Sequence, residues 1–506
     1  MNKLSDENRR KVMKSLIFLT EKRDGQIKGR ACANGSKQRQ WMDKRTTTSP
    51  TVALESILLT CVIDAKEERD VATVDIPNAF IQTDNEGEIV IMKVRGQLAE
   101  ILCSTAPEIY QEYMTKENGQ PVLYLEVLKA LYGLLQSALL FYKKLRKDLE
   151  DIGFEVNPYD PCVANMIVNG KQLTVTWHVD DLKISHVERI IIDCLIDWLR
   201  MKYEDVNKVK ATRGKIHDYL GMKLDFSDVG KVKINMSRYV TAMIESFEYK
   251  HLLKEKVKTP AADHLFRVNK NAKKLDKLRA EIFHTTVAKG LFLCKRSRTD
   301  IQPTIAFLCT RVKSPDEDDW KKLLRLLNYL KDTVDLVTTL EADNTHMIKW
   351  HVDASFAVHP DMRSHTGGAM TLGKGAVQTI STKQKINTKS STEAELVGVD
   401  DVIGQILWTK WFLEYQGYDA GEIILYQDNM SAMFLEKYRK ESSSKRTRHI
   451  NIKYFFITDC LRREQLGTKY CPTDEMDADF LSKPLQGRKF IKFRNWLMNI
   501  QTPRRQ

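Results

Sequence analysis

Residues 176–186 read TWHVDDLKISH and set two adjacent acids, Asp180 and Asp181, between two runs in which apolar and polar side chains alternate. Alternation with a period of two predicts β-strands, and Asp is a common turn residue, so the stretch predicts a β-hairpin with both acids at its tip. Two ionised carboxylates at this spacing repel each other unless a cation lies between them. The hairpin is therefore either a solvated Asp-Asp turn or a ligand pair for a divalent metal.

Length and composition describe a globular protein that suits a polyanionic partner. The chain has 506 residues, enough for about two to four domains with hydrophobic cores. Its hydrophobic fraction is 42%, its charged fraction is 29% and its formal net charge is +13. This excess of Lys and Arg favours nucleic acid as a partner, although basic runs such as residues 439–449 are also common on solvated surfaces.

The cysteines and the apolar runs exclude several other classes of protein. All nine cysteines occur singly, without a CxxC pair, which argues for reduced thiols and against a zinc module or a disulfide framework. The longest apolar run, residues 54–63, is interrupted by Asp64 and Lys66, so we expect no membrane span. The first ten residues also lack the hydrophobic segment of a secretory signal.

Three regions differ in their pattern of apolar residues. Residues 1–235 mix strand-like alternation with helices such as 51–68. Residues 236–345 are predicted to be mostly helical, because apolar residues recur there at helical spacing. From residue 346 onward, strands are followed by helices, which predicts an α/β domain with a mixed sheet. The predicted fold class is therefore α/β (α+β), with several units along the chain.

A third acid follows another predicted strand. In residues 71–84, VATVDIPNAFIQTD, the strand-like run ends at Asp75, and Pro77 does not allow an ordinary central strand beyond it. Taken alone, Asp75 is equally suited to capping a helix or a turn. If the fold brings it beside Asp180 and Asp181, the three acids would hold two Mg²⁺ ions, which activate a 3′-hydroxyl and stabilise a leaving pyrophosphate.

The C-terminal region contains its own acids at the ends of predicted elements. Asp353 follows the strand predicted at 347–352, and Asp428 follows the strand predicted at 423–427. Two glutamates compete in the long helix that begins near residue 390. Glu393 has capping-box spacing from Ser390, which gives it a structural role. Glu395 is the preferred site residue, because it shares a sheet-facing stripe with apolar residues at helical spacing, namely Val399, Val402 and Ile406.

Several motifs of the first half occur in the order and spacing of a known family. They are VDIPNAF (74–80), LKALYGLLQSALLFYKKL (128–145), HVDDL (178–182) and DYLGMKLDF (218–226). With these motifs the chain resembles the Ty1/copia-type retrotransposon reverse transcriptases over most of its length. The resemblance implies a right-hand polymerase of fingers, palm and thumb, in which Asp75, Asp180 and Asp181 are the metal ligands.

The same resemblance implies substrate-binding residues. Arg30, assisted by Lys28, corresponds to a fingers arginine that contacts the nucleotide triphosphate, and Arg is suited to this by its planar fork. Phe80 corresponds to the aromatic that packs under the incoming sugar and excludes a 2′-hydroxyl. Gln136 corresponds to a residue of the nucleotide pocket, and Gly221 lies in the hairpin that grips the primer. Considered without the resemblance, Phe80 is suited to core packing and Arg30 to a surface ion pair.

A second group of motifs resembles the RNase H domain that follows copia-type polymerases. These motifs are HVDASFA (351–357), SSTEAELVGV (390–399), LYQDNMSA (425–432) and ADFLSKPL (478–485). The implied metal ligands are Asp353, Glu395, Asp428 and Asp479. Asp479 is chosen because it precedes the apolar pair of the last motif, whereas Asp474 and Asp477 are expected to be helix-start acids. His449 lies in a basic segment typical of the family, but no catalytic role follows for it.

The combined prediction is an RNA-directed DNA polymerase of a retrotransposon joined to RNase H. Its expected units are fingers and palm (1–235), a helical thumb and connection (236–345) and an RNase H-like domain (346–506). Each site is expected to take two Mg²⁺ ions, with Mn²⁺ as the alternative. The expected partners are RNA template, DNA primer, RNA–DNA hybrid, dNTPs and the other parts of a Gag-Pol polyprotein. The expected location is a cytoplasmic virus-like particle, with a nuclear stage after cDNA synthesis.

Departures from the family pattern keep two other interpretations open. His178 replaces the usual aromatic before Val-Asp-Asp, Ala138 and Leu139 replace a usual Pro-Arg pair, and the chain is expected to start within the fingers. These departures favour a decayed element copy that binds nucleic acid without catalysis. A host protein that kept only the nuclease is the third interpretation. The three acids of the polymerase motifs argue against it.

Overall fold

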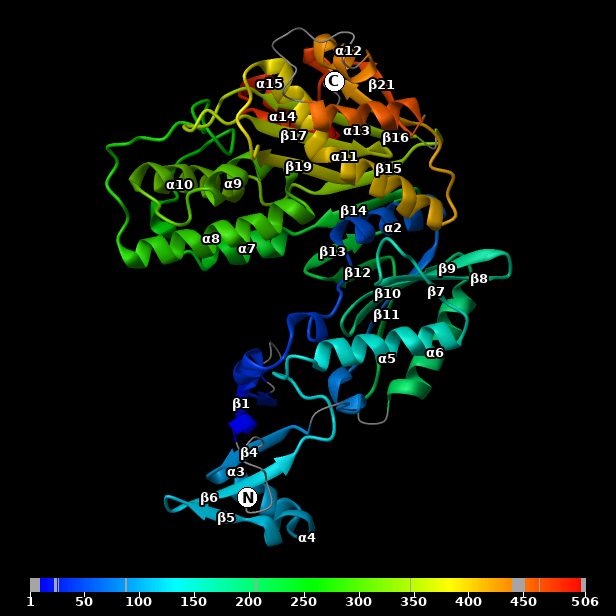
Figure 1. Ribbon diagram of the computed structural model, residues 1–506, viewed down its shortest axis with the longest axis vertical. Helices are drawn as coiled ribbons and strands as arrows, with labels where there is room; N and C mark the ends of the chain where they lie inside the picture. The colour runs from blue at the N-terminus through cyan, green and yellow to red at the C-terminus, as the bar shows by residue number, and fades with distance from the viewer. Residues whose placement is uncertain are drawn as a thin grey trace.

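Figure 1 shows the computed structural model, which describes residues 10–21, 25, 27–86, 89–204, 207–345, 347–438, 451–463 and 465–501. At Lys28, Thr46, Tyr438 and residues 451–455 it describes the backbone alone. The molecule is elongated, with a small sheet near the N-terminus at one end and the C-terminal unit at the other (Figure 1). It combines helices with sheets, as the α/β prediction required. No helix within the described ranges has the length and apolar character needed to span a membrane.

The first sheet, which we call the fingers sheet after the expected unit, forms the N-terminal end of the molecule. Its strand order is β2-β1-β4-β6-β5. The helices α3 (Gln97–Thr105) and α4 (Pro107–Tyr110) follow β4 and lie beside the sheet (Figure 1). Its cores are small, as expected for a thin layer with one helical cover. The strands are β1 (Met13–Glu21), β2 (Ile27–Ala33), β4 (Ile91–Arg95), β5 (Thr115–Glu117) and β6 (Gln120–Glu126).

The second sheet, called the palm sheet after the expected unit, lies in the middle of the molecule. It is antiparallel throughout, with the order β11-β3-β10-β9-β8-β7. Helices α5 (Ser137–Asp151) and α6 (Arg189–Tyr203) run across one side of it (Figure 1), and α2 (Leu54–Lys66) contributes to its buried core. The strands are β3 (Asp70–Asp75), β7 (Glu155–Val156), β8 (Val163–Val168), β9 (Lys171–His178), β10 (Asp181–His186) and β11 (Lys210–Gly214).

A bridging sheet with the order β12-β13-β14-β15-β18 connects the palm to the C-terminal unit. Its strands come from all three predicted units, so the boundaries at residues 235 and 345 do not separate independent sheets. Between β14 and β15 the chain forms a helical bundle, as its periodicity predicted. The strands are β12 (Ile216–Tyr219), β13 (Met222–Asp225), β14 (Lys231–Asn235), β15 (Thr338–Ala342) and β18 (Gly373–Lys374). The main helices are α7 (Ser237–Glu245), α8 (Lys277–Arg296), α9 (Gln302–Cys309) and α10 (Glu317–Asp332).

The C-terminal sheet is mixed, as predicted, with the order β19-β17-β16-β20-β21. β16 pairs antiparallel with β17 but parallel with β20. The strands are β16 (Ile348–Ser355), β17 (His365–Thr371), β19 (Gln378–Lys383), β20 (Ile423–Gln427) and β21 (Gly467–Tyr470). The helices are α11 (Ser391–Tyr415), α12 (Met430–Tyr438), α13 (Asn451–Arg462), α14 (Asp479–Ser482) and α15 (Gly487–Leu497). His449 lies outside the described residues.

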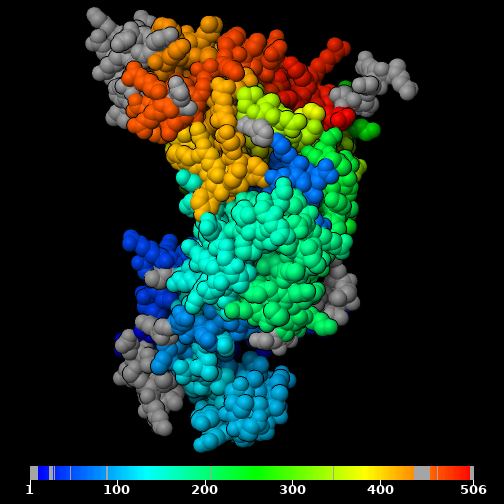
Figure 2. Space-filling view, turned by 90° about the vertical axis from the view of Figure 1, so that its right-hand side faces the viewer, coloured from blue at the N-terminus to red at the C-terminus, as the bar shows by residue number. Residues whose placement is uncertain are grey.

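The C-terminal unit contacts the palm through the second half of α11 and the loop that follows it. The indole Nε1 of Trp408 donates to the Tyr159 carbonyl at 3.0 Å, and the Tyr159 ring stacks on Trp411 with centroids 5.8 Å apart. Beside them, the buried Arg69 guanidinium donates to the Tyr418 hydroxyl at 3.0 Å. Figure 2 shows this gold segment of α11 lying directly on the green-blue palm.

Candidate active sites

The palm hairpin brings together the three acids that the sequence analysis singled out in the first half of the chain. Asp181, the first residue of β10, pairs directly with Asp75 on β3 and with His178 on β9. The Ile76 amide donates to the Asp180 carbonyl at 3.0 Å, which joins the hairpin turn to the end of β3. The three side chains therefore start from neighbouring backbone positions at one edge of the sheet.

The turn between the two hairpin strands is strained. It consists of Val179 and Asp180, and Val179 has a φ of 60°. A β-branched residue rarely adopts a positive φ, and such residues are concentrated at functional sites. Val179 takes the left-handed conformation that a two-residue turn normally assigns to glycine, and Asp180 follows it at the tip. The sequence shows only an ordinary Val at this position and gave no sign of the strain.

The electrostatics of the palm acids favour a bound cation. Burial, followed by the charge of Asp75, raises the pKa of Asp180. Burial, followed by the charges of Asp180 and Asp75, raises the pKa of Asp181. Only His178 and Arg30 act in the opposite direction among the side-chain charges that shift these two acids. A divalent cation would offset both the repulsion between these carboxylates and their loss of solvation, so the residues fit such an ion.

An aromatic pair lies next to the palm acids. The ring of Phe80 packs on Tyr132 with centroids 4.6 Å apart, and the Arg30 guanidinium lies 5.8 Å from the Tyr132 centroid. Burial, followed by the charge of Asp180, raises the pKa of the Tyr132 hydroxyl, so the ring lies near the acid cluster. Phe80 and Arg30 thus both contact the Tyr132 ring beside the acids. Tyr132 was quoted within a family motif but was not predicted as a site residue.

The other predicted substrate residues are placed differently. The Gln136 side-chain amide donates to Asn85 Oδ1 at 2.5 Å and lines a hollow between fingers and palm. Gly221 forms the β12–β13 turn with a φ of 82°, and a Cβ added there would lie 3.1 Å from Phe292 of α8. The Lys28 side chain lies outside the described residues.

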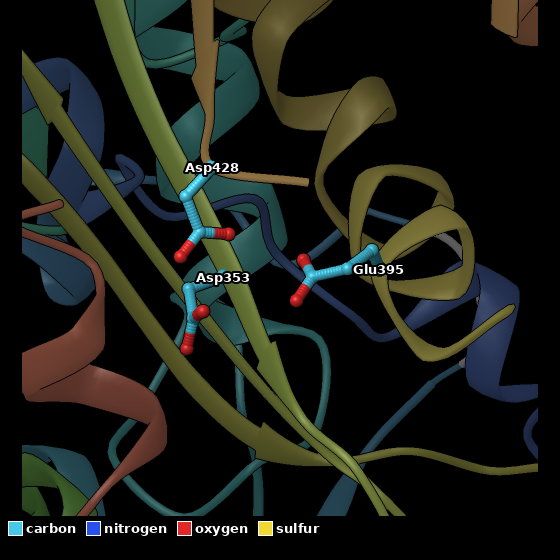
Figure 3. Close-up of side chains that lie close together, drawn as sticks. All are labelled: Asp353, Glu395 and Asp428. Carbon is cyan, nitrogen blue, oxygen red and sulfur yellow. The ribbon is translucent and has the colours of Figure 1, made fainter. Parts of the chain in front are cut away.

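A second acid group lies in the C-terminal unit. Asp353 of β16, Glu395 of α11 and Asp428, which follows β20, point toward one another (Figure 3). One carboxylate oxygen of each lies within 4.8 Å of the others, the only such group of three in the described ranges. Asp353 and Glu395 are buried, and Glu395 Oε2 has no hydrogen-bond partner. An unpaired buried carboxylate oxygen fits a metal ligand better than a structural acid.

The start of α11 explains why Glu395 joins this group and Glu393 does not. The Ser390 hydroxyl accepts from the Glu393 amide at 3.2 Å, and the Glu393 carboxylate accepts from the Lys389 amide at 2.6 Å. Glu393 therefore caps the helix, although through Lys389 instead of through Ser390 as a capping box would require. Glu395 lies on the face that packs against β16, as its apolar stripe predicted.

Burial and mutual repulsion define the electrostatics of this group. Burial, with the charges of Asp479 and Asp428 as lesser causes, raises the pKa of Asp353 to about 6. Burial, followed by the charges of Asp353 and Asp428, raises the pKa of Glu395 well above its usual value. A divalent cation would return both groups to the ionised form, because its charge outweighs the repulsion. The group is therefore suited to metal binding.

The family model described as reverse transcriptase (RNA-dependent DNA polymerase) matches residues 5–261, which include the fingers sheet and the palm acids. The chain belongs to the reverse transcriptase family. Its relatives place it among the copia-type retrotransposon enzymes.

The relatives of this reverse transcriptase are transposon polyproteins. It is 25% identical over 485 residues to the retrovirus-related Pol polyprotein from transposon TNT 1-94 of Nicotiana tabacum, which covers 93% of this chain and 34% of the relative. It is 21% identical over 505 residues to the transposon TyH3 Gag-Pol polyprotein of Saccharomyces cerevisiae, which covers 96% of this chain and 27% of the relative. The chain thus spans about a third or less of these curated relatives.

Among solved structures, the foamy viral protease-reverse transcriptase in complex with RNA/DNA hybrid is similar, with a TM-score of 0.49 and 12% identity. The match covers 91% of this chain and 50% of that one.

The fourth predicted nuclease acid of this reverse transcriptase, Asp479, lies beside the group of three, and two lysines occupy its oxygens. Oδ1 pairs with Lys483, and Oδ2 accepts from Lys489 at 3.0 Å. Lys483 Nζ also lies 3.2 Å from Asp353 Oδ1, so it bridges the two acids. Helix α14 can pack this closely on β17 because residue 367 is a glycine. A Cβ added to Gly367 would lie only 2.6 Å from the Ala478 carbonyl oxygen. Lys483 was quoted within a family motif, but its bridging position was not predicted.

The two acids that were expected to start a helix behave differently from each other. Asp474 lies in a short 3-10 turn and is exposed, close to that prediction. For Asp477 the prediction was wrong, because it lies two residues before α14 and is buried beside the His351 imidazole, with Nε2 at 3.7 Å. Burial raises the pKa of Asp477 to about 7. Neither acid belongs to the group of three.

Proposed function

We propose that this chain copies RNA into DNA at the palm and cleaves the RNA strand of RNA–DNA hybrids at the C-terminal acid group. The observation that carries the first activity is the direct pairing of Asp75 with Asp181, next to the strained turn that holds Asp180. The second activity is supported by the buried group of Asp353, Glu395 and Asp428. In both places, neighbouring carboxylates raise each other's pKa, and a bound cation would relieve their repulsion.

At the palm, Asp75, Asp180 and Asp181 would hold two divalent ions, Mg²⁺ with Mn²⁺ as the alternative. When bound, such ions activate a 3′-hydroxyl and neutralise the leaving pyrophosphate. The chain's own residues orient the nucleotide. Arg30 offers its planar fork to the triphosphate, assisted by Lys28, and the Phe80–Tyr132 pair forms an aromatic surface for the sugar. Gln136 acts from the fingers–palm junction, through Asn85.

At the C-terminal site, Asp353, Glu395 and Asp428 would hold one Mg²⁺ ion directly, and a second would require Asp479. When bound, these ions supply the activated water and the stabilisation of the leaving 3′-oxygen. Asp479 takes part only after its contact with Lys483 is rearranged, because that ammonium lies between Asp479 and Asp353. The nuclease is therefore proposed to depend on the position of a residue of its own chain.

The substrates and setting follow from the proposed activities. RNA template, DNA primer, RNA–DNA hybrid and dNTPs are the molecules that the two sites require. The polyprotein names of the relatives support release from, or action within, a Gag-Pol polyprotein. We place the enzyme in a cytoplasmic virus-like particle, with a nuclear stage after cDNA synthesis.

Primer extension and hybrid cleavage test both activities on the same protein. The full chain would be assayed with Mg²⁺ on poly(rA)–oligo(dT) and on a labelled RNA–DNA hybrid, beside Asp180→Asn and Glu395→Gln. We expect Asp180→Asn to lower extension by about a thousandfold while cleavage is retained, because about 4 kcal/mol of transition-state stabilisation depends on metal contacts. Glu395→Gln should do the reverse. Equal melting temperatures would show that both variants fold.

Three other outcomes would each contradict part of the proposal. Tight binding of the hybrid without extension or cleavage would identify a decayed copy that only binds nucleic acid. Cleavage without extension in the unmodified chain would identify a retained nuclease. If Asp180→Asn and Glu395→Gln each abolished both activities, the two acid groups would not be separate sites.

A further inference from the structure

An arginine at the end of α8 is half-buried and has no carboxylate partner among the described residues. The guanidinium of Arg296 stacks on the Phe292 ring, with its central carbon 3.6 Å from the ring centroid. One of its terminal nitrogens donates weakly to the Phe292 carbonyl at 3.4 Å, and its Nε is buried without a hydrogen-bond partner. Burial lowers the pKa of Arg296, and no carboxylate opposes this effect. The described part of the chain therefore holds a partly desolvated positive charge without neutralising it.

Arg279 and Arg298 of the same helical bundle are paired with carboxylates, in contrast to Arg296. Arg279, on the same helix, makes a two-pronged contact with Glu317 at 2.6 and 2.9 Å. The buried Arg298 makes a two-pronged contact with Asp300 at 2.9 and 2.8 Å. Within the described ranges, no carboxylate lies within 4.0 Å of the Arg296 nitrogens, whereas the chain supplies one to each of these neighbours. The absent partner is therefore best sought outside the chain.

The surroundings of Arg296 indicate which partner fits. The Phe292 ring on which it stacks also contacts the β12–β13 turn at Gly221, and it stacks on Tyr239 with centroids 5.1 Å apart. Arg296 thus lies on the aromatic support of the hairpin that is proposed to grip the primer. A hollow beside it is lined by the exposed Lys295 and by Glu55, which makes no ion pair with Arg296. A planar guanidinium held flat on an aromatic ring is suited to a phosphate group.

We infer that Arg296 binds a backbone phosphate of the nucleic-acid strand that passes along the surface formed by α8 and the β12–β13 hairpin. This inference rests on the proposed polymerase function. The Phe292 ring fixes the plane of the guanidinium before the strand arrives, so little side-chain freedom is lost on binding. The contact is independent of sequence, because a phosphate carries no base identity. Arg296 therefore sets the affinity and position of the strand and takes no part in the chemical step.

Salt-dependent binding tests the inference on the full chain. Binding of an RNA–DNA hybrid would be measured between low and moderate salt for the unmodified protein and for Arg296→Gln. We expect Arg296→Gln to bind about tenfold more weakly at low salt, with a slope of log affinity against log salt reduced by about one. The matched control is Arg279→Gln, which removes the same charge from the same helix but from a pair already neutralised by Glu317. It should leave the slope unchanged.

A modified primer strand identifies the contact directly. Neutral methylphosphonate linkages would be placed one at a time along the strand. One linkage should weaken binding by the unmodified protein as much as Arg296→Gln does, and should have no further effect on that variant. Arg296→Lys should keep the salt slope but lose part of the affinity, since it cannot stack in the same plane.

Each remaining outcome has a distinct meaning. If the unmodified protein does not bind the hybrid, the proposed function fails. If it binds, and Arg296→Gln binds with equal affinity and slope, the inference about Arg296 fails alone. A lower melting temperature for Arg296→Gln would also count against it. Removing an unpaired, partly desolvated charge should leave stability unchanged or improve it.

Discussion

At the scale of single residues, Lys483 links the two halves of the C-terminal acid site. Burial alone would lower the pKa of Lys483, but the charges of Asp353 and Asp479 outweigh burial and raise it. The Ser482 hydroxyl, one residue earlier, also bonds to Asp353. Without a metal, Lys483 is therefore the counter-ion of this acid pair, and a divalent cation that uses both acids must compete with it.

Lys483→Met should make the protein more dependent on divalent cations. In EDTA we expect the variant to melt at a lower temperature, which corresponds to a loss of about 2 kcal/mol in the free energy of unfolding. This figure already allows for solvent screening, because 35% of the Lys483 side chain is exposed. Added Mn²⁺ should raise the melting temperature of the variant more than that of the unmodified protein. Lys489→Met is the control, since Lys489 contacts Asp479 but not Asp353. Identical Mn²⁺ shifts in all three proteins would refute the role given to Lys483.

The strained turn of the palm hairpin supports a second prediction at this scale. Val179→Gly should raise the free energy of unfolding by about 1 kcal/mol, because glycine adopts a positive φ without strain. The larger backbone entropy of glycine in the unfolded state offsets only part of this gain. Thermal unfolding would measure it. The control is Val168→Gly at the end of β8, where φ is not positive and glycine should be destabilising. A lower stability for both variants would show that Val179 is not strained.

At the scale of elements, the spacing of apolar residues predicted the strands and helix faces that local sequence determines. The alternation in 71–75 and 176–186 predicted β3 and the β9–β10 hairpin, and the helical spacing of Glu395 with Val399 and Val402 predicted the face of α11 that meets the sheet. The bridging sheet was not predicted. It depends on pairing between Val232 and Leu340, more than a hundred residues apart, and no local pattern encodes such a pairing.

Local sequence patterns also failed to predict two residues of the candidate sites, for the same reason. Tyr132 and Lys483 both lie in motifs that the sequence analysis quoted, but their importance comes from contacts with distant residues. Tyr132 lies beside Phe80 and Asp180, and Lys483 lies beside Asp353. A lysine between two acids is a side-chain arrangement that spacing along one helix does not reveal.

The buried Glu436 of α12 supports a prediction about this element. Its carboxylate accepts from Gln427 Nε2 at 3.1 Å, one residue before Asp428, and burial raises its pKa to about 8. Because the folded state keeps the proton longer than the unfolded state, stability falls as pH rises from the unfolded pKa of about 4.5 to about 8. The slope of this contribution is at most about 1.4 kcal/mol per pH unit.

Glu436→Gln should remove this dependence while keeping the acceptor for Gln427. We expect the variant to exceed the unmodified protein in melting temperature at pH 8, with a much smaller difference at pH 5. Melting curves from pH 5 to pH 9 would measure this. Glu414→Gln on α11, where the side chain is exposed, is the control. Parallel curves for the Glu436→Gln variant and the unmodified protein would mean that Glu436 is already ionised in the folded state.

At the scale of the whole molecule, the palm and the C-terminal unit are held together by specific contacts. The Arg69 guanidinium joins Glu67 and Thr174 of the palm to the Tyr418 hydroxyl, and Tyr418 in turn donates to Glu67. The stack of Tyr159 on Trp411 adds an apolar contact a short distance away. Two acid sites on units joined in this way act on one substrate at a fixed separation, provided the proposed activities are correct.

Loosening this contact should change where the RNA is cut without changing either chemistry. In the double variant Tyr418→Phe/Trp411→Ala, the hydroxyl link to Arg69 and the ring stack on Tyr159 are both lost. We expect extension and hybrid cleavage to keep their separate rates. The distance between the primer 3′-end and the RNA cut should spread over more nucleotides, because the nuclease is no longer held in one orientation to the palm. The measurement is the length distribution of end-labelled RNA fragments during primer extension.

The control is Tyr415→Phe, on the same helix but with an exposed ring. It should leave the fragment lengths unchanged. An unchanged distribution in the double variant would mean that the bridging sheet alone holds the two units, since β14, β15 and β18 already pair across them. A lost activity in the double variant, with a normal melting temperature, would mean that the contact also shapes one of the sites. Only a broadened distribution with both rates retained agrees with a contact that sets the separation of the two sites.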